Sequence, residues 1–82
     1  MGRTIATTVQ QIQAEEGLLQ AFRRALREED RPAFDRLWRY ARYHGVPISM
    51  ANRPVPFEAI LVAMLVELDK KIEQLRLKNQ QP

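Results

Sequence analysis

The residues best suited to chemistry lie between positions 36 and 57, a stretch that contains no acidic side chain. Arginines and aromatic or imidazole side chains alternate along it: Arg36, Trp38, Arg39, Tyr40, Arg42, Tyr43, His44 and Arg53. At helical spacing, one face carries Arg36, Arg39, Tyr40 and Tyr43, opposite Phe34, Leu37, Trp38 and Ala41. Guanidinium groups bind phosphates and carboxylates through a planar fork, and tyrosine rings stack on bases or pack in protein interfaces.

This basic, aromatic face has two interpretations. As a protein interface, it would make the chain a non-catalytic interaction or regulatory module, and we favour this reading. As the alternative, the same face would bind nucleic acid, with phosphate contacts from Arg23, Arg24, Arg27, Arg42 and Arg53. A mild basic patch without a known binding motif is a weak signal for nucleic acid. Asp35 also lies four residues from both Arg31 and Arg39, which predicts ordinary charge pairing within a helix.

Catalytic and metal-binding residues are not indicated by any motif. His44 and Ser49 are the only histidine and serine, and no third group completes a nucleophilic arrangement with them. At the end of a helix, His44 is expected to act as a charge partner for the helix dipole. Cysteine is absent and the carboxylates show no metal-ligand spacing. We therefore predict no catalytic residue, no metal and no cofactor, with an enzyme as the third interpretation.

Length and composition predict one globular domain over residues 1–82. Hydrophobic residues make up 45% and charged residues 28%, and 13 basic against 10 acidic residues give a net charge of +3. The N-terminus lacks the apolar segment of a signal peptide. The apolar run that begins at Phe57 is too short to span a bilayer and is interrupted by Glu58 and Glu67. A soluble, cytoplasmic protein without membrane contact is expected.

Three main helices are predicted. The first begins at Thr7 or Thr8, in a capping-box pattern, and ends at residues 28–30, with a bend or break possible at Gly17. Its apolar positions are Val9, Ile12, Leu19, Phe22 and Leu26. The second covers Arg31 to His44, with Pro32 in its first turn and Gly45 as its stop.

A proline-containing link separates the second helix from the third. Residues 46–56 include three prolines, which predict a kink, one further helical turn over residues 47–51 and an extended segment over residues 52–56. The third helix is expected from about Pro56 to Lys78. The chain ends, residues 1–6 and 79–82, are expected to fray.

The third helix is apolar on two sides, which is unusual for a surface helix. One side carries the stripe expected to face the core: Phe57, Ile60, Leu61, Met64, Leu65 and Leu68. The other side carries Ala59, Val62, Ala63 and Val66. Leu61, Leu65, Leu68, Ile72 and Leu75 also alternate spacings of four and three.

A homodimer follows from this two-sided helix, because a short chain needs a second copy to cover both sides. We predict the interface at Ala59, Val62, Ala63 and Val66; in the alternative, the link over residues 46–56 folds back over these side chains. The fold class is therefore all-α, a helical bundle of three main helices completed by dimerisation. A higher oligomer stays open.

Several segments resemble a group of small archaeal helical proteins of unknown function. They are Met1-Gly2-Arg3-Thr4, Phe22-Arg23-Arg24-Ala25-Leu26-Arg27, Phe34-Asp35-Arg36-Leu37, Tyr40-Ala41-Arg42 with His44, and Leu68-Asp69-Lys70-Lys71-Ile72-Glu73. The resemblance implies an archaeal helical protein and carries over no activity or site residue.

Overall fold

The computed structural model of the chain describes residues 4–80, and within this range the protein is helical and contains no strand. The elements are α1 (Thr4–Leu18), α2 (Gln20–Ala25), the 3₁₀ helix η1 (Glu28–Asp30), α3 (Arg31–Tyr43), α4 (Gly45–Ala51) and α5 (Pro56–Asn79). The all-α prediction is confirmed. Of the ends that we expected to fray, residues 1–3, 81 and 82 lie outside the described range. α1 already begins at Thr4, before the predicted start at Thr7 or Thr8, and α5 includes Asn79.

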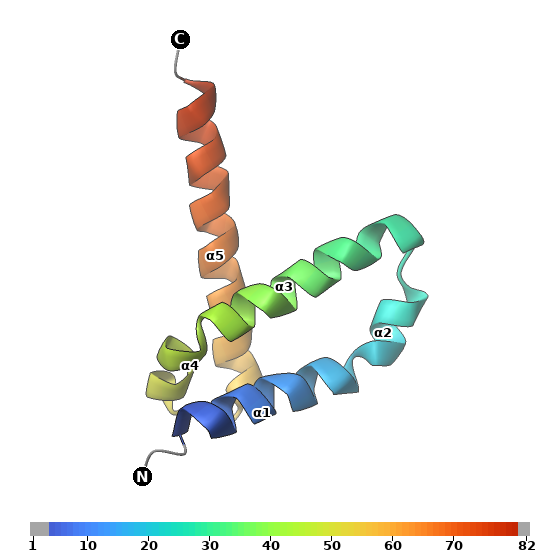
Figure 1. The fold of residues 1–82 in the computed structure, drawn as a ribbon, viewed down its shortest axis with the longest axis vertical. Helices are drawn as coiled ribbons and strands as arrows, with labels where there is room; N and C mark the ends of the chain where they lie inside the picture. Colours follow the sequence, from blue (N-terminus) through green and yellow to red (C-terminus); the bar gives the residue numbers. More distant parts are fainter. Residues whose placement is uncertain (1–3, 81–82) are drawn as a thin grey trace.

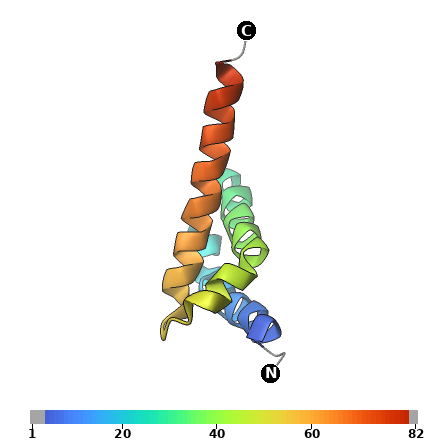
Figure 2. The same cartoon turned by 90° about the vertical axis from the view of Figure 1, so that its left-hand side faces the viewer.

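The helices form an open, elongated arrangement that measures 50 × 32 × 17 Å along its principal axes. α1 and α3 both cross the first half of α5, while α2 joins them at a tip far from α5 (Figure 1). The second half of α5 rises clear of the other helices in both views (Figures 1 and 2). This projecting half is the main exception to the compact bundle expected from the sequence.

The predicted first helix is two helices in the structure. α1 ends at Leu18, Leu19 leaves helical geometry with φ −101° and ψ 14°, and α2 ends where Leu26 becomes extended. The break that we considered at Gly17 therefore lies two residues further on. Gly17 itself is helical, but its low helix propensity weakens the turn before the break.

The link between α3 and α5 is kinked and contains one short helix, as predicted. Gly45 was expected to stop the preceding helix, but it begins α4 after a kink at His44. α4 ends at Asn52, whose φ of 50° is the left-handed conformation that asparagine tolerates better than most residues. Val55 is extended ahead of Pro56, since residues before proline avoid helical angles.

The core lies where α1, α3, α4 and α5 meet. Its buried apolar residues are Ile12, Phe34, Trp38, Ala41, Ile48, Ile60, Ala63 and Met64. Trp38 is 2% exposed, and its ring centroid lies 6.2 Å from that of Phe34 and 6.4 Å from that of Phe57. The predicted apolar stripe of α3 is confirmed by these contacts, with Leu37 packed at its edge.

α5 is rotated relative to our prediction. Its core face consists of Ile60, Ala63, Met64 and Glu67, with Phe57 half-buried beside them. Leu61 and Leu65 were predicted to be in the core stripe, but they are 43% and 62% exposed. The prediction of the stripe is confirmed for Ile60 and Met64 and is wrong for Leu61 and Leu65, because hydrophobicity alone could not rank two adjoining apolar faces. Contacts with Trp38 and His44 select the face that carries Phe57 and Glu67.

Replacement of Ile60, which has no exposed surface, tests this orientation of α5. Ile60→Ala is expected to lower the free energy of unfolding by about 2–5 kcal/mol, because it leaves a cavity in the core. Leu77→Ala, on the exposed end of the same helix, is expected to change it by less than about 0.5 kcal/mol. Urea unfolding followed by far-UV circular dichroism measures both values. Equal effects of the two replacements would contradict this orientation.

Candidate interaction site

The predicted recognition face lies on the side of α3 that faces away from the core. Arg36, Arg39 and Tyr43 are exposed there, and Tyr40 is half-buried. Among the residues that the structure describes, Arg36 and Arg39 form no ion pair. Their guanidinium groups are therefore free to bind an acidic group from outside the chain.

Two lysines of α5 extend this face. The Lys71 ammonium lies 5.3 Å from the ring centroid of Tyr40, and the Lys70 ammonium lies 5.4 Å from that of Tyr43. Both are within the range of cation–π attraction. One face of each tyrosine ring is thus occupied by its own chain, which reduces the ring surface left for a stacked base. Sequence spacing could not show this, because it does not tell which helix packs beside α3.

A buried carboxylate lies under the two lysines. Glu67 is only 5% exposed. His44 Nε2 donates a 2.8 Å hydrogen bond to its Oε1, and Lys70 and Lys71 form ion pairs with it at 3.1 and 3.3 Å. The hydrogen bond from His44 and those from the two lysines lower the pKa of Glu67 to about 2, against the opposing effect of burial.

Glu67 is the residue of this site that sequence analysis missed. We considered Glu67 only as a charge that interrupts the apolar run from Phe57. The signal was its spacing from Ile60 and Met64, which places a charge on an otherwise apolar face of the helix. A carboxylate at such a position requires a buried partner. The only histidine of the chain, His44, supplies one, so its main contact is this carboxylate rather than the dipole of α3.

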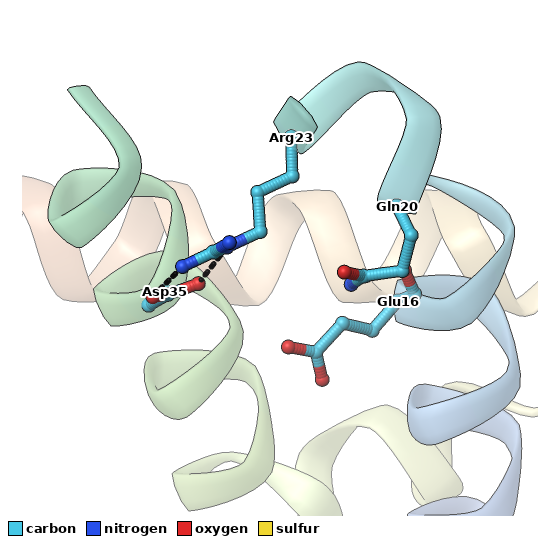
Figure 3. A network of polar contacts seen from close by, with 4 residues as sticks. All are labelled: Glu16, Gln20, Arg23 and Asp35. Atoms are coloured by element: carbon cyan, nitrogen blue, oxygen red, sulfur yellow. Dashed lines mark hydrogen bonds and ion pairs between the residues drawn. The ribbon is translucent and has the colours of Figure 1, made fainter. Parts of the chain in front are cut away.

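Most of the predicted phosphate contacts are occupied by acidic residues of the same chain. Arg23 Nε and Nη2 donate two 2.8 Å hydrogen bonds to the carboxylate of Asp35, which holds the pKa of Asp35 below its usual value (Figure 3). We had expected Asp35 to pair within its own helix with Arg31 and Arg39. Its ion pair is instead with Arg23 of α2, and Arg39 adds a smaller electrostatic attraction. Arg42 pairs with Glu16 at 3.0 Å. Arg53 pairs with Glu58 at 2.6 Å.

The remaining two predicted phosphate contacts, Arg24 and Arg27, are exposed and form no ion pair with described residues. They lie on and just after α2, toward the tip of the molecule. Of the five predicted phosphate contacts, three arginines are thus paired with carboxylates, and Arg24 and Arg27 form no ion pair with any described residue. The basic surface is smaller than the composition of the sequence indicated.

An apolar groove of about 630 Å³ runs between α4 and α5. It is lined by Pro47, Ile48 and Ala51 of α4, by Ala59, Val62, Ala63 and Val66 of α5, and by His44, Arg53 and Glu58. The four residues of the predicted dimer interface all lie in this groove. Ala63 is buried and Ala59 half-buried, while Val62 and Val66 are 58% and 54% exposed. The link thus covers this face in part, and two valines stay open to a partner.

The carboxylates, His44 and Ser49 are the other candidates for chemistry in residues 4–80. No group of three possible metal ligands lies together in this part of the chain. Ser49 is half-buried on α4, and His44 is engaged by Glu67. Within the same residues, no helix has the length and apolar character needed to cross a bilayer.

The depressed pKa of Glu67 predicts a pH dependence of stability. Its folded pKa of about 2 lies below its ordinary value of 4.5, so the ionised carboxylate contributes stability that is fully present above pH 4.5. This contribution is lost as the pH falls toward 2. Glu67→Gln is expected to be less stable than the wild type near neutral pH, and the difference should shrink on acidification. Thermal unfolding from pH 2 to pH 7 measures it; a difference that does not change with pH would contradict the ionic role.

Comparison with known proteins gives one match. Over residues 1–81 the chain matches a protein family described as Domain of unknown function (DUF8156). No curated protein and no solved structure matches it. The match covers nearly the whole chain and supports the expectation of a protein without an assigned activity, whereas the archaeal origin implied by the resemblance stays an expectation. The chain belongs to the DUF8156 family.

Proposed function

We propose that this protein is a non-catalytic interaction module that works as a homodimer in the cytoplasm. Its recognition face for another protein is the outer side of α3, with Arg36, Arg39, Tyr40 and Tyr43. The single observation that carries the proposal is the large apolar surface of α5 that no other helix covers. The non-catalytic part rests on the sequence, in which no nucleophile, acid–base pair or metal-ligand spacing stands out.

The uncovered surface of α5 favours association with a second copy. Leu65, Ile72 and Leu75 are each about 60% exposed, and Val62 and Val66 are each more than half exposed. Full burial of such a side chain contributes about 1.5–3 kcal/mol. The remaining exposed part of each is therefore worth roughly 1 kcal/mol, and every contact occurs twice in a symmetric dimer.

The recognition face has the composition of a protein interface. Arginine and tyrosine are enriched in such interfaces, and both occur here on one exposed helix side. Arg36 and Arg39 form no ion pair with the described residues, and Asp35 attracts Arg39 only through space, so an acidic partner surface would complete their pairing. Lys70 and Lys71 add positive charge beside them.

The mass of the protein in solution tests the homodimer. Size-exclusion chromatography with light scattering is expected to give twice the 9.6 kDa of one chain at micromolar concentration, with dissociation on dilution. A mass of one chain at all accessible concentrations would contradict the proposal.

Nucleic-acid binding by the same face is the second candidate. It is favoured by the unpaired Arg36 and Arg39 and weakened by the pairing of Arg23, Arg42 and Arg53 with carboxylates. A protein that neutralises phosphates binds nucleic acid less tightly as salt increases, with a linear log–log dependence.

A salt titration with labelled single- and double-stranded nucleic acid separates the two candidates. On our first proposal, no binding is expected at low salt. Salt-sensitive binding that is lost in Arg36→Ala/Arg39→Ala would favour the second candidate. This double variant is expected to change the free energy of unfolding by no more than about 0.5 kcal/mol per site, because both side chains are exposed and unpaired. A circular dichroism melt of the variant provides the control.

A further inference from the structure

We propose that two copies of the chain pair along the α5 seam as a parallel, two-stranded coiled coil. The α5 seam consists of Leu61, Leu65, Leu68, Ile72 and Leu75. This inference rests on the homodimer proposed above and names a surface for it that differs from the groove-lining residues predicted from the sequence.

The spacing of the seam is that of a coiled coil. Its members are separated by four, three, four and three residues, which places them on one side of a helix at the average period of 3.5 residues. In heptad terms, Leu65 and Ile72 occupy a positions, and Leu61, Leu68 and Leu75 occupy d positions. Within one chain most of the seam stays outside the core, because the core takes the neighbouring face with Ile60, Met64 and Glu67.

The seam continues onto the part of α5 that no other helix covers. Beyond Lys70 and Lys71, which lie over the tyrosines of α3, the helix stands clear of the molecule in Figures 1 and 2. The segment from Asp69 to Asn79 is exposed at every residue. At 1.5 Å per residue it extends about 16 Å. Helical segments of this length are marginal in water without packing. A second copy would bury Ile72 and Leu75 and so stabilise the projecting half.

The residue types favour two parallel strands. An isoleucine at an a position combined with leucine at d positions favours a two-stranded coil. The next a position is Asn79, the last residue of α5. In a parallel, in-register pair Asn79 meets Asn79 of the other copy and can hydrogen-bond to it, whereas an antiparallel pair would place it opposite apolar seam residues. A buried asparagine at one a position is a known determinant of register.

The charges beside the seam are compatible with this arrangement. Lys71 and Arg76 flank the seam at g and e positions and would approach each other between parallel copies. Each already has a carboxylate partner on its own helix: Lys71 lies 3.3 Å from Glu67, and Arg76 lies 2.7 Å from Glu73. Their mutual repulsion is therefore reduced.

Three single glutamate replacements on α5 distinguish the seam from the other apolar faces. Ile72 is 62% exposed on the seam, and Val66 is 54% exposed in the groove. Leu77 is 50% exposed, away from the seam and on the same side of the helix as Val66, but about three turns beyond it. Ile72→Glu is expected to give a folded monomer at concentrations at which the wild type is a dimer. Val66→Glu and Leu77→Glu are expected to remain dimers. Light scattering measures the mass, and circular dichroism confirms that each variant is helical.

An introduced cysteine tests the orientation, since the chain has no cysteine of its own. Oxidation of Asn79→Cys is expected to link nearly all chains into disulfide dimers, because the two sulfurs meet across a parallel seam. Leu77→Cys, two residues away on the outer side, is expected to link few. Addition of Ile72→Glu to Asn79→Cys should abolish the linkage.

Each contrary result has its own meaning. A monomeric wild type overturns both the homodimer and the seam. If the wild type is a dimer and Ile72→Glu is too, the seam is wrong while the homodimer stands, and a monomeric Val66→Glu would assign the interface to the groove. If Ile72→Glu is a monomer but Asn79→Cys does not form disulfide dimers, the parallel orientation is wrong.

Discussion

The orientation of α5 about its own axis is the constraint on which the other surfaces of this protein depend. Trp38 of α3 packs against Phe57, and His44 at the end of α3 binds Glu67, ten residues further along α5. These two contacts hold the helix at both ends of its buried segment. Once they are made, Ile60 and Met64 are committed to the core. Leu61 and Leu65, one position further round the helix, are left outside.

The sequence was sufficient to predict the elements that rely on a single apolar stripe. α3 has one such stripe, and its extent and its buried residues Phe34, Trp38 and Ala41 agree with the prediction. The proline-containing link was predictable too, because Pro47, Pro54 and Pro56 restrict their own and their neighbours' backbone angles. α5 has two adjoining apolar faces, so its choice of face depends on partners that are distant in sequence.

The candidate site was predictable only in part, for a related reason. Arg36 and Arg39 were placed correctly on an exposed face by helical periodicity. The pairing of Arg23 with Asp35 and of Arg42 with Glu16 joins different helices, and no spacing rule along one helix could have indicated it. Local patterns give the position of a charge on its helix. Whether that charge finds an opposite partner depends on how the helices pack against one another. Glu67 was overlooked for the same reason.

α2 shows how unevenly the packing is distributed. It is six residues long, contains no buried residue and lies at the tip farthest from α5. It is held by the Arg23–Asp35 ion pair and by the ring contact between Phe22 and Phe34, whose centroids are 5.9 Å apart. With so few contacts, its backbone amides belong to a local unit that opens at a small free-energy cost. Amide hydrogen exchange in α2 therefore measures local opening of this end of the molecule. Exchange at Trp38 and Ile60 measures unfolding of the whole chain.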